Sequence, residues 1–239
     1  GEVLWDVFPD GPHFGGAPAN VSCAIAGLLG NQANVTMVSA VGNDTLGREA
    51  IESLKKRNVD VSALQTTPLP TGTVTVNLDN DHQATYQFAQ NCAWDNITWS
   101  ESLHDFASKA EVVCFGSLAQ RTELSRQTIQ KFIRATPANT LKIFDINLRA
   151  NFYTDETIIQ SLTLANVLKL NEEELPIIAD VLAMSGDKPF TKETNHDDTI
   201  CLLKTIQQRF QLSCIALTQG SDGAILLRHD QQVTVPIVP

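Results

Sequence analysis

The positions of apolar residues divide the chain into alternating strand-like and helix-like segments. Residues 34–41 (NVTMVSAV) alternate with a period of two, which predicts a strand. Residues 44–57 place apolar side chains on one helical face, with Asp44 as N-cap and three basic residues at the negative end of the helix dipole. Buried strands are then predicted at 111–115, 141–145, 167–170 and 214–218, and helices at 122–135, 172–183 and 197–210. This alternation indicates an α/β fold with a doubly wound, mostly parallel sheet flanked by helices.

One region departs from the alternation. Residues 71–78 (TGTVTVNL) and 83–88 (QATYQF), joined by 79–81 (DND), predict a β-hairpin with no helix of its own. A small β lid outside the core is one interpretation, and an edge extension of the main sheet is the other. Residues 185–198 are polar and rich in turn formers, which predicts a surface loop.

Composition narrows the class of protein. The chain has 239 residues, 43% of them apolar, which is an ordinary globular composition with room for one large α/β domain. The net charge of −10 argues against a nucleic-acid partner and against binding to an anionic membrane surface. No apolar run is long enough to span a bilayer and no basic-then-apolar leader is present, so we expect a cytoplasmic protein. The five cysteines form no C-x-x-C pair and are expected to be reduced, mostly buried thiols.

The first twenty residues combine groups that could bind a ligand. A strand over residues 1–6 would deliver Asp6 at its carboxyl end, and Gly15 and Gly16 precede a helix over 18–29 that carries Asn20. A glycine pair lets a ligand approach the backbone, and a carboxylate accepts hydrogen bonds from two adjacent hydroxyls, which suits a polyol. A glycine turn needed only for tight strand–helix packing explains the pattern equally well.

Five motifs follow one another along almost the whole chain. The motifs are GEVLWDVFPDG…GGAPAN at 1–20, VGNDTLG at 41–47, FDINLR at 144–149, LNEEE at 170–174 and TQGSDG at 218–223. Their order resembles that of the ribokinase-like (PfkB) sugar kinases, and the first motif is most similar to that of the fructokinases. The sequence contains neither G-x-x-x-x-G-K-[ST] nor G-x-G-x-x-G, which excludes a Walker-type phosphate loop and argues against a dinucleotide.

The resemblance implies a role for eleven residues. Six would bind the sugar or the transferred phosphate: Asp6, Gly15, Gly16, Asn20, Asp145 and Arg149. Four would bind the nucleotide: Asn171, Thr218, Gly220 and Gly223. Glu174 would organise Mg²⁺ through water, while a first-turn dipole role covers Glu172 and Glu173. ATP and Mg²⁺ are the implied cofactors, with a monovalent cation as a further candidate.

Each motif taken alone also has a purely structural interpretation. A lone Arg such as Arg149 is more often in a surface ion pair than on a phosphate, although the neighbouring Asp145 and Asn147 favour a functional role. Residues 218–220 could form a plain β-turn before the next strand. The order of all five motifs is what favours a kinase site, with the two groups of residues meeting in one crevice.

The expected activity is transfer of phosphate from ATP to a sugar, with D-fructose giving fructose 6-phosphate. The alternatives are a kinase for 2-keto-3-deoxygluconate or ribose, and a catalytically dead sugar-binding protein. The family's catalytic G-A-G-D segment does not occur within the 239 residues, so we expect a single domain that is incomplete at both ends, with its base beyond Pro239. The resemblance also implies a homodimer formed through the lid, whose strands would lie within residues 4–14 and 71–97.

Overall fold

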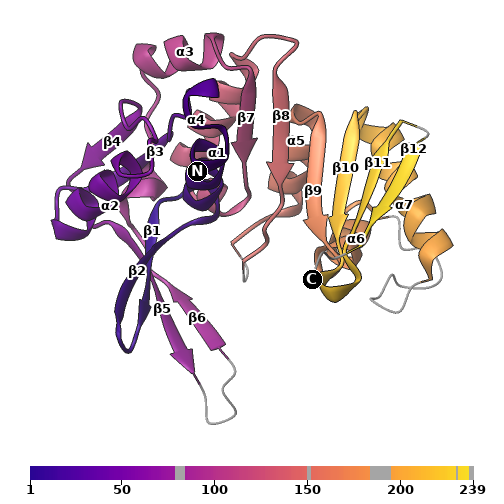
Figure 1. Ribbon diagram of the computed structural model, residues 1–239, viewed down its shortest axis with the longest axis horizontal. Coiled ribbons are helices and arrows are strands. Elements are labelled where there is room, and N and C mark those ends of the chain that lie inside the picture. Colours follow the sequence, from indigo (N-terminus) through magenta and orange to yellow (C-terminus); the bar gives the residue numbers. More distant parts are fainter. Residues whose placement is uncertain (79–83, 150–151, 184–194, 230, 237–239) are drawn as a thin grey trace. The chain divides into compact units, whose positions relative to one another are not determined.

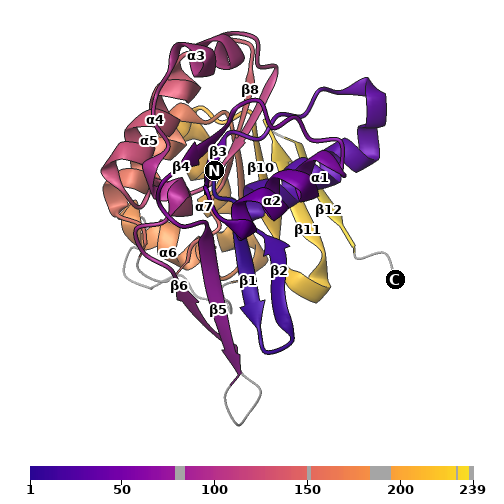
Figure 2. The same cartoon turned by 90° about the vertical axis from the view of Figure 1, so that its left-hand side faces the viewer.

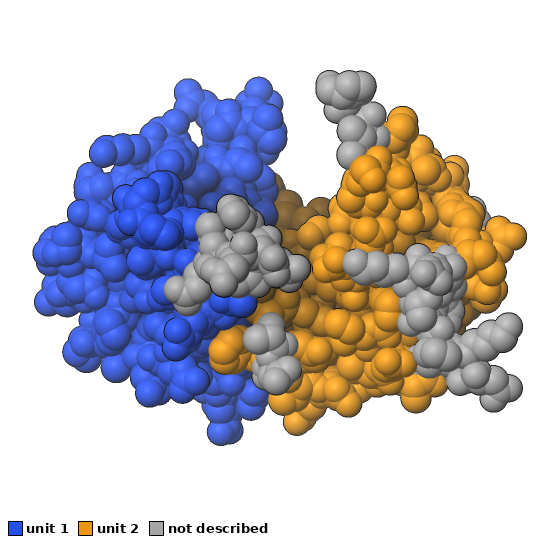
Figure 3. Space-filling view, turned by 90° about the horizontal axis from the view of Figure 1, so that it is seen from below, with its two compact units in different colours: residues 1–109, 118–135 blue, residues 110–117, 136–239 orange. Residues whose placement is uncertain are grey.

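The structure is a computed structural model that describes residues 1–78, 84–149, 152–183, 195–229 and 231–236. The tip of the predicted hairpin (79–81) and most of the predicted loop at 185–198 lie outside these residues. Contacts within the chain define two compact units (Figure 3). Unit 1 consists of Gly1–Lys109 and Leu118–Ala135, and unit 2 of Ala110–Ser117 and Thr136–Pro239.

Unit 1 contains a four-stranded sheet formed from two hairpins. Its strand order is β2-β1-β5-β6, with β1 parallel to β5 and antiparallel to β2 (Figure 2). A second, two-stranded sheet pairs β3 with β4 in parallel. The strands are β1 (Leu4–Phe8), β2 (Gly11–Gly15), β3 (Ser39–Gly42), β4 (Leu64–Thr67), β5 (Gly72–Leu78) and β6 (Ala84–Phe88). The hairpin β5–β6 forms one edge of this four-stranded sheet and is not part of the six-stranded sheet described below.

The first strand differs from its prediction. We expected it to end at Asp6 at the carboxyl edge of the parallel sheet, whereas β1 continues to Phe8 and pairs with β2. The two residues between Phe8 and Gly11 form the turn, and Asp6 lies opposite His13 in the middle of the ladder. Because the loop has only two residues, strand pairing extends up to Phe8 and Gly11, and Asp6 lies inside the paired region.

Two helices of unit 1, at 45–55 and 123–134, lie where the amphipathic pattern predicted them. Asp44 caps α2 by accepting a hydrogen bond from the Gly47 N–H at 2.7 Å, so the predicted N-cap is confirmed. The helix α3 was not predicted. The helices are α1 (Ala17–Leu29), α2 (Thr45–Lys55), α3 (Glu101–Ser108) and α4 (Glu123–Arg134), with short 3-10 turns at Gly30–Gln32, Ala93–Asn96 and Leu118–Gln120.

Asp44 also fixes the start of β5. Its carboxylate accepts hydrogen bonds from the N–H of Thr71 at 2.8 Å and from the Thr71 hydroxyl at 2.7 Å. The N–H of Gly42 in turn donates to the same hydroxyl oxygen at 2.9 Å. Burial alone would raise the pKa of Asp44, but the hydrogen bonds from Thr71 and Gly47, with the nearby Arg48 charge, lower it. The VGNDTLG motif therefore ties α2 to the four-stranded sheet.

A buried ion pair lies at the same end of that sheet, where β6 ends beside the start of β5. Arg121 is 7% exposed and Asp95 is 2% exposed, and two nitrogen–oxygen contacts of 2.7 Å join them. The guanidinium also donates to the carbonyl of Ala89, just after β6, and lies 3.9 Å over the ring of Trp94. Burial raises the pKa of the neighbouring Cys92 thiol to about 12, with the Asp95 charge adding to the effect and Arg121 opposing it. This pair fixes the return of the hairpin against the start of α4.

Unit 2 is built on a six-stranded sheet with the order β12-β11-β10-β9-β8-β7 (Figure 1). The first four strands along the chain are parallel, and β11 and β12 are antiparallel additions. The strands are β7 (Val112–Phe115), β8 (Leu141–Asp145), β9 (Val167–Asn171), β10 (Cys214–Thr218), β11 (Ala224–Arg228) and β12 (Gln231–Val235). The helices are α5 (Asp155–Leu164), α6 (Glu174–Val181) and α7 (His196–Phe210), of which α5 was not predicted.

The two faces of this sheet are buried to different degrees. Side chains pointing to one face are almost inaccessible, as at Phe144, Leu168, Leu170, Ile215 and Leu217, and α5, α6 and α7 contact β8, β9 and β10. Alternate residues point to the other face. Large apolar side chains remain exposed there, including Leu226 (39%), Val233 (55%) and Val235 (40%). The predicted α/β fold class is confirmed.

All five cysteines are free thiols, and Cys201 is exposed. No helix among the described residues combines the length and the apolar character that crossing a membrane requires.

Candidate functional site

The predicted residues of unit 2 lie along one edge of its sheet. The strand β8 ends at Asp145, β9 at Asn171 and β10 at Thr218. Because these strands are parallel and Asn171 lies opposite Thr218 in the ladder, their carboxyl ends meet at the same edge. Ligands of open α/β sheets bind at this edge.

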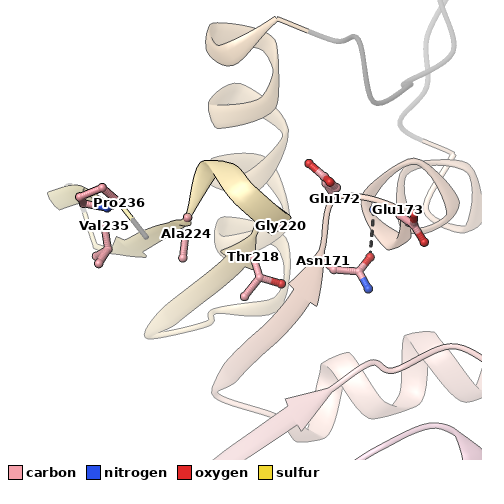
Figure 4. Close-up of a pocket in the computed structure, with 9 residues that line it drawn as sticks. Asn171, Glu172, Glu173, Thr218, Gly220, Ala224, Val235 and Pro236 are labelled. Carbon is pink, nitrogen blue, oxygen red and sulfur yellow. Dashed lines mark hydrogen bonds between the residues drawn. The ribbon is translucent and has the colours of Figure 1, made fainter. Parts of the chain in front are cut away.

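A pocket of about 530 Å³ lies at this edge, between the ends of β9, β10 and β12 (Figure 4). All four residues predicted to bind a nucleotide line it. The lining residues are Asn171, Glu172, Glu173, Thr218, Gly220, Gly223, Ala224, Val235 and Pro236. The structure therefore brings these four residues together, although they come from segments almost fifty residues apart in the sequence.

The glycine loop after β10 has a conformation that requires glycine. Gly220 has φ +49° and Gly223 has φ +91°, and a short 3-10 turn over Gly220–Asp222 lies between the strand and Gly223. A Cβ on Gly223 would collide with the carbonyl oxygen of Val235, whereas one on Gly220 would meet only the Glu172 carboxylate at 3.7 Å. The close approach of β12 therefore fixes one wall of the pocket at Gly223.

Asn171 and Glu174 form a reciprocal cap at the start of α6. The side-chain oxygen of Asn171 accepts hydrogen bonds from the N–H groups of Glu173 and Glu174, each at 2.9 Å. Glu174 returns a carboxylate oxygen to the N–H of Asn171 at 2.9 Å. This is the geometry of a capping box, which explains the three-residue spacing of the N-x-x-E motif.

The end of β8 carries the other predicted residues of unit 2. Asp145 forms an ion pair with Lys169 at 3.0 Å, opposite it on β9. Asn147 has a positive φ of 44°, so the chain turns sharply before Arg149. Arg149 is exposed, and its guanidinium donates to the carbonyl of Leu148 at 2.9 Å.

The residues of unit 1 that were predicted to bind the sugar also lie close together in the structure. Gly15 lies against the carboxylate of Asp6, because a Cβ there would overlap the Asp6 Oδ2 atom. Gly16 has φ +104° and precedes α1, whose first turn exposes Asn20. The packing interpretation and the ligand-binding interpretation of this segment both stay open. Gly15 and Gly16 are needed for close packing, and Asp6 and Asn20 place polar groups beside them.

Several pocket residues were missed in the sequence. Glu172 and Glu173 were assigned only a dipole role, yet both line the pocket. Val235 and Pro236 line it because β12 folds back along β11, and no local signal of the sequence encodes that return. The ion pair of Lys169 with Asp145 was also missed. A lysine within an otherwise apolar strand is unusual, and it was a signal for a charged partner nearby.

The lining of the pocket combines hydrogen-bonding groups with negative charge. It offers the Thr218 hydroxyl, the Asn171 amide and the backbone of a glycine loop, and none of the described residues that line it has a basic side chain. The carboxylates of Glu172 and Glu173 add negative charge. A bare polyphosphate would be repelled by them, whereas a phosphate group carrying a divalent cation would not.

An α/β fold with a glycine-loop pocket at the carboxyl edge of its sheet defines a protein that binds a small ligand at its strand ends. Residues 11–239 match the model of the pfkB family carbohydrate kinases. The chain belongs to this family, and the predicted resemblance is confirmed. It is therefore a phosphotransferase of the sugar kinase class.

Individual relatives agree with this assignment. The chain is 30% identical over 252 residues to a fructokinase of Klebsiella pneumoniae, covering 100% of this chain and 76% of that protein. It is 33% identical over 170 residues to the putative sugar kinase PH1459 of Pyrococcus horikoshii, covering 68% of this chain and 54% of that protein. The apo fructokinase of Vibrio cholerae O395 has a similar structure, with a TM-score of 0.79, 27% identity and coverage of 99% of this chain and 78% of the other.

Proposed function

We propose that the protein transfers the terminal phosphate of ATP to D-fructose, giving fructose 6-phosphate. The observation that carries the proposal is the pocket at the ends of β9 and β10, lined by Asn171, Thr218, Gly220 and Gly223. Support for the ligands comes from similar structures. PH1459 was solved in complex with ATP, and the Vibrio cholerae fructokinase with fructose, ADP and calcium ion bound, at TM-scores of 0.78 and 0.77.

The nucleotide belongs in the unit 2 pocket. Thr218 and the glycine loop offer a hydroxyl and backbone donors to phosphate oxygens, and Asn171 offers an amide. Arg149, exposed after the turn at Asn147, supplies a planar fork that suits a phosphate oxygen pair. Phosphoryl transfer depends chiefly on positioning and charge neutralisation, and these groups provide both.

Mg²⁺ is proposed to accompany the nucleotide. Mg²⁺ is commonly held by one or two carboxylates together with substrate phosphates and water. Glu172 and Glu173 supply such carboxylates in the pocket. Bound there, the ion would neutralise phosphate charge. A monovalent cation stays a further candidate, supported by a Vibrio cholerae fructokinase variant solved with fructose, ADP and potassium ion.

The sugar is proposed to bind in unit 1 at Asp6 and Asn20, beside Gly15 and Gly16. The resemblance separately implies a sugar-binding role for Asp145. The Asp6 carboxylate lies directly against Gly15, so a ligand that replaces water there would meet backbone and carboxylate together. A carboxylate and an amide suit adjacent hydroxyls, which fructose, ribose and 2-keto-3-deoxygluconate all carry. Discrimination among them depends on single hydroxyl contacts.

The test is a phosphorylation assay of the full-length gene product with ATP against fructose, ribose, 2-keto-3-deoxygluconate and a nucleoside panel, with products identified by mass spectrometry. We expect fructose to give the highest kcat/KM. A preference for a nucleoside would overturn the fructose assignment, and ATP and fructose binding without turnover would favour the non-catalytic alternative. Thr218→Val should raise the KM for ATP by about threefold to tenfold, the effect of losing one hydrogen bond. Thr205→Val, on the exposed face of α7, is the matched control.

We also propose a cytoplasmic homodimer that forms through the four-stranded sheet of unit 1. Its edge strands are β2 and β6, and Tyr86 on β6 is 59% exposed. Exposed strand edges invite pairing with another chain. Sedimentation of the full-length protein should give a dimer at micromolar concentration, and a monomer there would count against the proposal.

A further inference from the structure

We infer that Lys169 is a phosphate-binding residue, whose ammonium group leaves Asp145 for the terminal phosphate of the bound nucleotide. The inference rests on the proposed function, because it adds a residue to the same site. Lys169 belongs to β9 and lies two residues before Asn171, which lines the pocket. Its Nζ atom lies 3.0 Å from the Oδ1 atom of Asp145 on the neighbouring strand β8.

Lys169 points to the same face of the unit 2 sheet as the polar residues at the strand ends. Residues that lie opposite each other on paired strands share a face, and so do alternate residues of one strand. Asp145 lies opposite Lys169, and Thr218 lies opposite Asn171. The four residues therefore form two successive rows on one face, with Asp145 and Lys169 in the row behind the pocket.

The side chain of Lys169 is long enough to reach the next row. A strand rises about 3.3 Å per residue, so the row of Asn171 lies about 7 Å further along β9. Lysine carries its charge on a flexible four-carbon stem, which spans most of that distance. Ala216 lies opposite Lys169 on β10, and its methyl group adds little bulk beside the stem.

The charges at this edge of the sheet favour a cation beside the phosphates. None of the described residues that line the pocket is basic, and Glu172 and Glu173 add negative charge there. Along β8, β9 and β10, which the structure describes completely, Lys169 is the single basic residue on the face that it shares with Asn171. Phosphoryl transfer requires neutralisation of the charge on the transferred group, and Lys169 is placed to contribute to it.

The pair between Lys169 and Asp145 is held loosely enough to exchange partners. The two side chains are 37% and 20% exposed, and a partly exposed ion pair contributes only modestly to stability. The Oδ1 atom of Asp145 accepts no aligned hydrogen bond from any described residue, so charge alone holds the ammonium group there. A terminal phosphate carries more negative charge than one carboxylate and competes with it for the cation.

The position of Lys169 also indicates which phosphate it binds. It lies between Asn171, at the nucleotide pocket, and Asp145, to which the resemblance assigns a role toward the sugar. The phosphate nearest to the sugar is the one that is transferred, so the partner of Lys169 is the terminal phosphate. Departure of the ammonium group leaves the Asp145 carboxylate able to accept a hydrogen bond from a sugar hydroxyl.

The experiment measures nucleotide binding without sugar. Titration calorimetry of the full-length protein compares a non-hydrolysable ATP analogue with ADP, each with Mg²⁺. Lys169→Met should weaken binding of the analogue about tenfold, because one charge-assisted hydrogen bond is lost, and should change ADP binding by less than about twofold. Lys169→Arg keeps the charge and should stay within about threefold of wild type. Lys204→Met, at an exposed position of α7, is the matched control for the loss of one charge and should change neither affinity.

Asp145→Asn distinguishes partner exchange from a purely structural ion pair. It removes the carboxylate that competes for Lys169, so the analogue should bind about threefold more tightly than to wild type. The inference is overturned if Asp145→Asn leaves the affinity unchanged or weakens it, or if Lys169→Met weakens binding of the analogue and of ADP equally. Should Lys169→Met fail to fold, the sign of the change in Asp145→Asn decides.

Failure of the proposed function gives a different result. If the wild-type protein binds the analogue but phosphorylates no sugar, the proposed function is wrong, and the calorimetric comparison still decides the role of Lys169. If the wild-type protein binds neither nucleotide, both the proposed function and this inference are overturned.

Discussion

The ion pair between Asp95 and Arg121 provides a stringent test of how unit 1 is held together. Both side chains are almost fully buried, with two contacts of 2.7 Å between them. Replacing Asp95 by Ala leaves the Arg121 guanidinium in the interior without its carboxylate. Breaking a buried pair on one side costs about 3–5 kcal/mol in free energy of unfolding, because a buried charge loses its compensation. We expect Asp95→Ala to lose that much.

A double-mutant cycle measures the interaction itself. Asp95→Ala, Arg121→Ala and the double variant are unfolded in urea and followed by circular dichroism. The double variant should be less destabilised than the sum of the single variants, since no charge remains buried alone. Glu52→Ala is the control, because its pair with Lys55 at 3.3 Å is exposed and should contribute less than about 1 kcal/mol. The reasoning is refuted if Asp95→Ala costs no more than Glu52→Ala.

Three further predictions concern other parts of the molecule. Because the folded-state pKa of Asp44 lies below its unfolded value, its contribution to stability is complete above about pH 4 and is lost as the pH falls through the folded-state pKa. Asp44→Asn should therefore flatten the dependence of the urea midpoint on pH in this acid range, and an unchanged profile would contradict the network at Thr71. With its pKa raised to about 12, Cys92 should stay unmodified by iodoacetamide at pH 8 while the exposed Cys201 reacts, as peptide mass spectrometry can check; equal labelling in the native protein would refute the burial argument. Gly223→Ala should cost more stability than Gly220→Ala, by about 1–2 kcal/mol, because both positions have positive φ but only the first meets a carbonyl oxygen; equal thermal shifts would oppose this.

The sequence predicted best what is decided locally. The helix α2 was recognised from its amphipathic face and from Asp44 as N-cap, both of which depend on residues within one or two turns. The buried strands β8, β9 and β10 were recognised because they are short apolar runs between polar segments. Asn171, Thr218, Gly220 and Gly223 were found from motifs at strand ends, and the parallel topology brings them to one pocket.

The features that the sequence could not predict depend on contacts between segments that are far apart in the sequence. The strand β1 pairs with β2 and β5, and the alternation of its own side chains does not indicate either partner. For the same reason Asp6 was assigned to a strand end, although it lies within the ladder. Glu174 illustrates a second limit: its metal role stays a prediction, and its hydrogen bond from the N–H of Leu148 could not be predicted because it depends on where β8 ends. That the residues of both units share one crevice stays a prediction.

The apolar side chains at the edge of the unit 2 sheet have a consequence for protein engineering. Leu226 and Val233 lie opposite each other on β11 and β12, and with Val235 they form an exposed apolar strip on the outermost strands. Apolar surface of this kind favours aggregation when no other segment covers it. In any shortened form of this chain that leaves the strip exposed, Leu226→Thr, Val233→Thr and Val235→Lys should therefore reduce aggregation.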